Sequence, residues 1–241
     1  MTKNVETGHA RNVENFKRLQ EYIAGFGSKY APGDARLQPA NITLISQNSA
    51  ATMEAVNAAT PPYLQAVSRR EQAFANIPSL ASRALQIAET LHIDAASLNA
   101  LKELVRKLHG RRATPKKTEA QQEHKTISIS HLSFDQRTEH FAQFVALLAA
   151  ESAYQPAETE LSVTAFTAHL AEMRAANEAV TQTSIPPANA RNARNTVLYA
   201  PLTGLVDVAH DVKRYVRAAF GNDSGEYKEI KSLEFKKQSE K

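Results

Sequence analysis

An eight-residue pattern occurs twice in the chain, and this repetition constrains the fold more than any other feature. Residues 30–37 read YAPGDARL and residues 154–161 read YQPAETEL, so Tyr-x-Pro-x-acid-x-x-Leu recurs 124 positions later. Around both copies, apolar residues recur every three to four positions, as on one face of a helix. Because this apolar phase is kept over several separate segments, the sequence predicts a tandem duplication of a unit of roughly 100 residues.

The alignment of the two predicted repeats needs small shifts in register. At an offset of 125, residues 16–23 align with residues 141–148, and the pair Pro61-Pro62 aligns with Pro186-Pro187. The same offset matches Phe74, Ile77, Leu80, Ala84 and Ile87 with Tyr199, Leu202, Leu205, Ala209 and Val212. We expect equivalent structural roles at the matched polar positions, which are Arg69 with Arg194 and Tyr30 with Tyr154.

Each repeat is predicted to contain successive helices. The first covers about 12–24 and 134–150, and Ser133 is a suitable N-cap for the latter. The second covers about 34–59 and 158–183, and the proline pairs are predicted to end it. The third covers about 62–91 and 187–220, with a kink or break expected at Pro78 and Pro201.

The end of each repeat is predicted to differ. Repeat 1 has a fourth helix that Asp94 caps and Gly110 ends, whereas the stretch after Gly221 is long enough for about one helical turn. Residues 126–133 (TISISHLS) and 230–237 (IKSLEFKK) alternate apolar and polar residues, so a short β-ribbon between them is a further prediction.

The predicted fold class is therefore all-α, with two tandem antiparallel helical bundles in an elongated molecule. The predicted domains are repeat 1 at 11–110, a basic linker at 111–132 and repeat 2 at 133–237.

Several strings in the second repeat carry a resemblance to a known family. They are ARNARNTVLY, TGLVDVAHDVKRYVRAAFG and YKEIKSLEF, together with SFDQRTEHF after the linker. With them the chain resembles a family of uncharacterised bacterial proteins, frequent among Bacteroidota, that consist of two similar helical segments. The resemblance implies the duplicated helical architecture, and it implies no activity, cofactor or catalytic residue.

Composition limits the classes of function. The chain has no cysteine, which excludes disulfides, cysteine-ligated zinc and a thiol nucleophile. The first 20 residues lack the apolar region of a secretory signal, and the apolar run at 144–150 is too short to span a bilayer. We therefore expect a cytoplasmic protein with no membrane partner. The net charge of +4 is compatible with nucleic acid or an acidic partner without requiring one.

The strongest candidate for a ligand cluster is the string DVAHD. Asp207, His210 and Asp211 are spaced i, i+3 and i+4, so they share one helical face and could hold a divalent metal with help from a neighbouring helix. The alternative is a solvated face on which these residues pair with neighbouring charges, and this alternative is favoured. We therefore expect no bound metal and no cofactor.

Two sets of basic residues offer a second kind of site. Arg111, Arg112, Lys116 and Lys117 form the densest basic patch, and they could neutralise phosphates of a nucleic acid. The arginines near 69 and 194 could add a phosphate-binding stripe, although a buried structural role for Arg69 and Arg194 is favoured. No aromatic residues lie between the basic residues of the patch, so a solvated linker is the favoured interpretation there.

No catalytic signature is present, so we expect a protein that is not an enzyme. The leading hypothesis is a helical scaffold or protein-interaction module that associates with itself or with another protein through its long helices. The alternative hypothesis is a nucleic-acid-associated protein that uses the basic linker and the arginine stripes.

Overall fold

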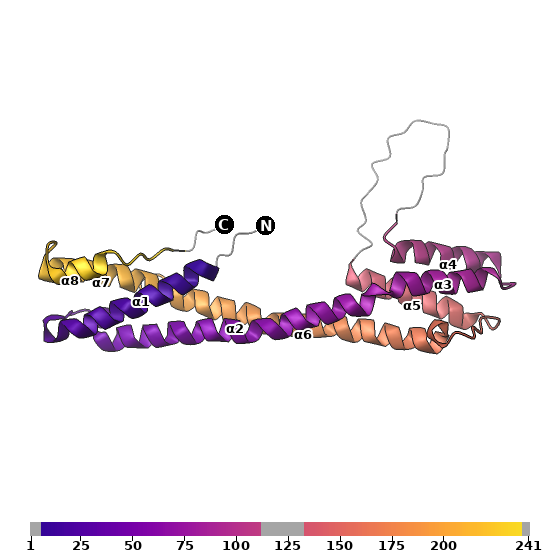
Figure 1. The fold of residues 1–241 in the computed structure, drawn as a ribbon, viewed down its shortest axis with the longest axis horizontal. Helices are drawn as coiled ribbons and strands as arrows, with labels where there is room; N and C mark the ends of the chain where they lie inside the picture. Colours follow the sequence, from indigo (N-terminus) through magenta and orange to yellow (C-terminus); the bar gives the residue numbers. More distant parts are fainter. Residues whose placement is uncertain (1–5, 112–132, 238–241) are drawn as a thin grey trace, which may run out of the picture. The chain divides into compact units, whose positions relative to one another are not determined.

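The computed structural model describes residues 6–111 and 133–237, and these residues are organised as helices joined by short connections (Figure 1). The predicted all-α class is therefore confirmed, and no strand occurs in the two described ranges. Within the same ranges, no helix combines the length and the apolar character needed to cross a membrane.

The chain forms two compact units that each draw on both predicted repeats. Unit 1 combines residues 1–61 with residues 184–241, and unit 2 consists of residues 62–183. These units do not coincide with the predicted domains at 11–110 and 133–237, because two long helices each contribute one part to each unit.

Those two helices are α2 (Pro39–Ala75) and α6 (Val163–Tyr199), each of 37 residues. Both run through the proline pairs, so the predicted helix ends at Pro61-Pro62 and Pro186-Pro187 are wrong. A buried stripe continues past the prolines, with Val180, Pro187 and Arg194 buried at intervals of seven residues. This packing outweighs the hydrogen bonds that the prolines remove.

The helices break instead near Pro78 and Pro201, as predicted. Helix α3 (Ile77–Glu89) follows Asn76 directly, whereas α7 (Leu205–Phe220) follows a connection at 200–204. In that connection Leu202 has a positive φ of 66° and is 67% exposed. The expected match of Leu202 with the buried Ile77 is therefore wrong, because Leu202 lies in a connection before α7 whereas Ile77 begins α3.

The structure gives a different register for aligning the two predicted repeats. Helices α2 and α6 begin and end 124 positions apart, so Arg194 corresponds to Arg70 and not to Arg69. Helices α3 and α7 correspond at an offset of 128, where their buried positions coincide. These matched positions are Ile77, Leu80, Ala81, Ala84 and Ala88 with Leu205, Val208, Ala209, Val212 and Val216.

Unit 1 contains α1 (Glu6–Phe26), the 3-10 turns η1 (Gly27–Lys29) and η2 (Ala35–Leu37), the N-terminal part of α2, the C-terminal part of α6, α7 and α8 (Gly225–Lys231). Contacts join α1 to α7 and α8, and join η2 to α7. The apolar faces of the helices in unit 1 form a core that includes Phe16, Leu19, Ile23, Leu198, Leu205, Val212 and Val216.

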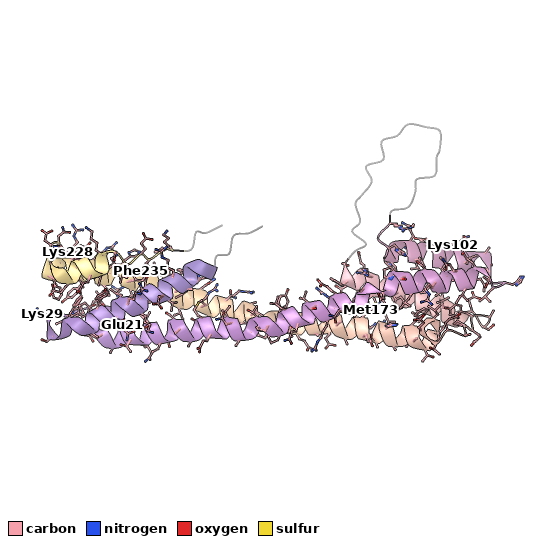
Figure 2. All side chains as sticks on the ribbon, in the orientation of Figure 1. Glu21, Lys29, Lys102, Met173, Lys228 and Phe235 are labelled. Carbon is pink, nitrogen blue, oxygen red and sulfur yellow. The ribbon has the colours of Figure 1, made fainter. Side chains whose placement is uncertain are left out.

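The predicted β-ribbon is wrong for the part that the structure describes. Residues 230–231 end α8, and residues 232–237 form no strand with any part of the described ranges; residues 126–132 lie outside those ranges. Leu233 and Phe235 are buried while Glu234 and Lys236 are exposed, which accounts for the alternating sequence. Helix α1 holds this segment instead of a partner strand, because Asn12 exchanges hydrogen bonds with the Lys236 backbone at 2.9 and 3.1 Å. Phe235 of the same segment is labelled in Figure 2.

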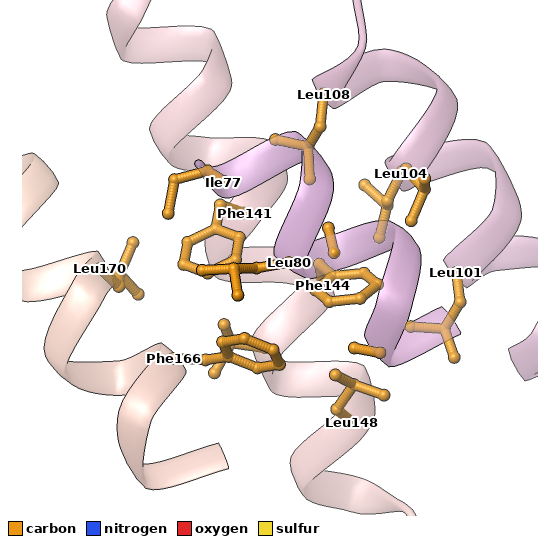
Figure 3. Close-up of a cluster of buried hydrophobic side chains, with 14 of the residues drawn as sticks. Ile77, Leu80, Leu101, Leu104, Leu108, Phe141, Phe144, Leu148, Phe166 and Leu170 are labelled. Atoms are coloured by element: carbon orange, nitrogen blue, oxygen red, sulfur yellow. The ribbon is translucent and has the colours of Figure 1, made fainter. Parts of the chain in front are cut away.

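Unit 2 contains the C-terminal part of α2, α3, α4 (Ala95–Leu108), α5 (Phe134–Ala150), η3 (Thr159–Leu161) and the N-terminal part of α6. Phe141, Phe144 and Phe166 meet with their ring centroids 5.8–6.3 Å apart at the centre of the core. The rings pack in one core with side chains of α3 and α4, which are Ile77, Leu80, Leu101, Leu104 and Leu108 (Figure 3).

Three other helix ends follow the sequence signals. Helix α5 covers the predicted range, and the Ser133 hydroxyl accepts a hydrogen bond from the Gln136 amide at 3.2 Å. The Asp94 carboxylate accepts bonds from the first amides of α4. Gly221 has a φ of 97° after α7, a backbone conformation that glycine adopts without strain.

Candidate functional site

The structure places Asp207 of α7 between two partners. Its Oδ1 atom lies 2.8 Å from the Lys237 ammonium, and its Oδ2 atom accepts a hydrogen bond from the Leu202 amide at 3.1 Å. Hydrogen bonding to Lys237, with a smaller effect from the Leu202 amide, holds the pKa of Asp207 below its ordinary value. Asp207 therefore fastens the 200–204 connection and the extended C-terminal segment to α7.

Asp211, one turn further along α7, also has cationic partners. Its Oδ2 atom lies 3.3 Å from Arg36 Nη1, and its Oδ1 atom accepts a hydrogen bond from Arg214 at 3.1 Å. The Arg36 guanidinium also donates to the Leu202 carbonyl at 2.7 Å. Asp211 therefore joins α7 to η2 through Arg36.

His210 is exposed, and its ring lies edge-on to Phe235 with the centroids 6.2 Å apart. It shares a hollow of about 370 Å³ with both aspartates, Arg214, Lys237 and Leu202. A metal ion at this face would have to displace Lys237 from Asp207 and Arg36 from Asp211. These contacts favour the alternative in which the charges pair with neighbours, and residues 6–111 and 133–237 contain no group of three or more side chains arranged to hold a metal.

The two matched arginines differ in environment. Arg194 is only 3% exposed, and its Nε and Nη2 atoms donate to Asn195 Oδ1 at 3.2 and 3.0 Å. Arg69 is exposed and lines a hollow between α2 and α6 in unit 2. The structural counterpart of Arg194 is Arg70, whose guanidinium lies 4.0 Å above the Phe134 ring. Of these three arginines, Arg69 is the exposed one.

The matched tyrosines have the same role in both units. The Tyr30 hydroxyl donates to the Leu37 carbonyl and the Tyr154 hydroxyl donates to the Leu161 carbonyl, each over 2.8 Å. Both tyrosines are buried, at 4% and 3% exposure. The repeated pattern therefore builds a turn and contributes no reactive group.

Of the four basic linker residues, only Arg111 is described. It is exposed, and its backbone carbonyl accepts a hydrogen bond from Arg106 at 2.6 Å after the end of α4. Arg112, Lys116 and Lys117 lie outside the described residues.

A buried polar cluster in unit 1 was not predicted from the sequence. His9 is 2% exposed and Asn12 is 3% exposed. The Tyr199 hydroxyl lies 2.6 Å from His9 Nδ1, and it accepts a hydrogen bond from Asn12 at 3.4 Å. His9 and Tyr199 lie 190 positions apart in sequence, so no local spacing relates them. The cluster ties α1 to the end of α6.

The surface of unit 2 has an apolar groove between α4 and α5. Its volume is about 480 Å³, and it is lined by Ala100, Leu104, Ala146, Leu147, Glu103, Lys107 and Gln143. Glu103 and Lys107 pair with each other across 2.8 Å, and this contact lowers the pKa of Glu103. The groove therefore presents an apolar floor and a rim on which one acid and one base neutralise each other.

Fold and surface together define an all-helical protein whose best candidate ligand cluster is occupied by ion pairs between helices and turns. No family model matches the sequence. No curated protein and no solved structure matches it either. The arguments about function therefore depend on the residues of this chain.

Proposed function

We propose that this protein is a non-enzymatic helical scaffold or protein-interaction module that associates with other copies of itself or with a second protein. The observation that carries the proposal is the apolar groove between α4 and α5. A groove with this lining suits the apolar face of a partner helix, because binding would remove Leu147, Ala100 and Ala146 from water.

The rim supports the same occupant. Because Glu103 and Lys107 satisfy each other, an approaching apolar face leaves neither charge without a partner. A nucleotide or nucleic acid would instead need unpaired cations at the rim. The groove therefore favours a protein partner.

The test introduces a charge into the groove without disturbing the core. Ala146 is exposed and lines the groove, whereas Ala149, also exposed on α5, does not line it. We expect light scattering after size-exclusion chromatography to give a mass above 26.5 kDa for the natural protein. Ala146→Glu should lower that mass, and Ala149→Glu should leave it unchanged.

A monomeric mass for the natural protein would remove self-association from the proposal. The groove would then be tested by affinity capture of a protein partner. Capture that Ala146→Glu and Ala149→Glu reduce equally would contradict a role for the groove.

We further infer that the scaffold is a duplicated chain with an antiparallel bundle in each unit, and that it belongs to the Bacteroidota-type family that its strings resemble. The two 37-residue helices, the two identical tyrosine turns and the matched buried positions of α3 and α7 support the duplication. The short connections between successive helices support the antiparallel arrangement.

The second candidate function is nucleic-acid association through the basic linker. Its support is the clustering of four basic residues within positions 111–117, of which Arg111 is exposed. Nucleic acid that copurifies and is released by salt would favour it. Replacing the four residues by glutamine should abolish retention, whereas neutralising four exposed basic residues elsewhere should not. The matched control changes Lys17, Arg174, Arg191 and Lys228.

A further inference from the structure

Two ion pairs occupy matching places in the two units but have opposite polarity. In unit 1, Arg36 of η2 contacts Asp211 of α7 at 3.3 Å. In unit 2, Glu160 of η3 contacts Arg83 of α3 at 2.7 Å. The base lies on the 3-10 turn in one unit and on the helix in the other.

The positions are equivalent by two independent criteria. Arg36 and Glu160 are each the middle residue of their 3-10 turns, six positions after the buried tyrosine. Arg83 and Asp211 lie between matched buried residues of α3 and α7, since Ala81 corresponds to Ala209 and Ala84 corresponds to Val212. The reversal of charge is therefore a difference between equivalent sites.

Each ion pair joins the two repeats. The turn η2 belongs to repeat 1 and contacts α7 of repeat 2, and η3 of repeat 2 contacts α3 of repeat 1. The same exchange occurs where α1 of repeat 1 contacts α8 of repeat 2, and where α4 of repeat 1 contacts α5 of repeat 2. Each compact unit is therefore completed by a segment from the other repeat.

The polarity disfavours the alternative in which a repeat pairs with its own copy. Two copies of repeat 1 would place Arg36 opposite Arg83, and two copies of repeat 2 would place Glu160 opposite Asp211. Like charges at such contacts repel and so penalise the wrong partner. The matched apolar positions carry no charge, so they contribute no repulsion between like repeats.

We propose that the polarity of these two ion pairs specifies the pairing of repeat 1 with repeat 2, within one chain or between two copies of the chain. The proposal rests on the inferred duplication, and it concerns four residues that do not line the α4–α5 groove. Between a quarter and a little over half of each of these four side chains is exposed, so each pair adds little to stability. Its importance lies in the difference between the right and the wrong partner.

The test uses the full chain with a protease site inserted within residues 112–132. The folded protein is cleaved, unfolded, refolded and analysed by native mass spectrometry, which distinguishes the two halves by mass. The natural sequence should refold to a complex of one repeat 1 with one repeat 2. Dimers of like repeats should be a minor fraction.

The informative variant is Arg83→Glu/Glu160→Arg. It keeps an ion pair in unit 2 and so preserves the complex of repeat 1 with repeat 2. It also places opposite charges at the contacts of two copies of repeat 1 and of two copies of repeat 2. We expect the fraction of like dimers to rise by about tenfold, because two contacts in each like dimer change from repulsion to attraction. The matched control is Glu89→Lys/Lys102→Glu, which reverses the exposed 3.0 Å pair within repeat 1. The control should refold with the natural distribution.

Three outcomes would overturn the proposal. The first is that the natural sequence refolds to a statistical mixture of like and unlike dimers. The second is that the variant and the natural protein give the same distribution. The third is that the two halves separate after cleavage and each is folded on its own. The groove is tested separately, on the uncleaved chain with Ala146→Glu. Failure of the pairing proposal therefore leaves the result for the groove unaffected. Conversely, loss of the groove function would not alter the pairing of cleaved halves.

Discussion

The Tyr30 hydroxyl donates a hydrogen bond to the Leu37 carbonyl over 2.8 Å, and both groups belong to the turn between α1 and α2. The bond closes the Tyr-x-Pro-x-acid-x-x-Leu pattern from its first residue to its last. Because the pattern occurs twice and the bond forms twice, the repeated letters correspond to a repeated physical task.

Removing one of these hydroxyls should destabilise the fold. Tyr154→Phe leaves the Leu161 carbonyl buried without this donor, at a cost of about 1–3 kcal/mol in the free energy of unfolding. Urea denaturation of the variant and the natural protein would measure it. The control is Tyr22→Phe, since Tyr22 is 37% exposed and should be neutral. Equal stability of all three proteins would show that the bond does not stabilise the turn.

The same tyrosine predicts a loss of stability in alkali. Burial, assisted by the nearby Glu158, raises the pKa of Tyr154 from its ordinary value of 10.0 to about 12. Because the unfolded chain releases this proton at lower pH, the contribution of Tyr154 is complete below pH 10.0 and disappears as the pH rises towards about 12. Chemical denaturation across this range should show the decline. Tyr154→Phe should reduce its slope, and an unchanged slope would contradict the prediction.

The sequence predicted the local structure where the relevant signals are short-range. The caps at Asp94 and Ser133 and the breaks near Pro78 and Pro201 follow from residues within one helical turn. The proline pairs misled the prediction because propensity alone ends a helix there, whereas the buried stripe of α6 continues through it. The division into two units that each draw on both predicted repeats depends on contacts distant in sequence, which an internal alignment cannot reveal.

The candidate site shows the same limit. The spacing of Asp207, His210 and Asp211 correctly indicated one face of a helix. It could not indicate that Arg36 and Lys237 approach that face, because both come from elements far away in the chain. The correspondence between Asp211 and Arg83 was missed for a different reason. The offset of 125 used to align the sequence matched Asp211 with Gln86 and not with Arg83.

The connection before α7 predicts a sensitive glycine. A Cβ atom on Gly204 would lie 2.6 Å from the Ala200 amide nitrogen and 2.7 Å from its carbonyl oxygen, so the backbone would have to move. Gly204→Ala should therefore lower the free energy of unfolding by about 1–3 kcal/mol, as overpacking does in other cores. Thermal unfolding would measure the effect.

The matched control for Gly204 lies in helix α1. No atom lies within 4 Å of a Cβ placed on Gly25, so Gly25→Ala should raise stability by about 0.5–1 kcal/mol. A Gly204→Ala protein as stable as the natural protein would contradict the tight approach of this connection to the end of α6.

The Asp207–Lys237 contact predicts a loss of stability in acid. The pKa of Asp207 is lowered in the folded protein, so its contribution is present above the ordinary aspartate pKa of 3.8 and is lost as the pH falls through the lowered value. Asp207→Asn should cost about 0.5–1 kcal/mol at neutral pH, because the side chain is mostly shielded from solvent. The difference in stability from the natural protein should vanish at the acid end of a denaturation series.

The control is Asp223→Asn, at an exposed position, which should show no such difference at any pH. If the Asp207→Asn difference persisted unchanged in acid, packing of the connection at 200–204, and not the charge on Asp207, would account for it.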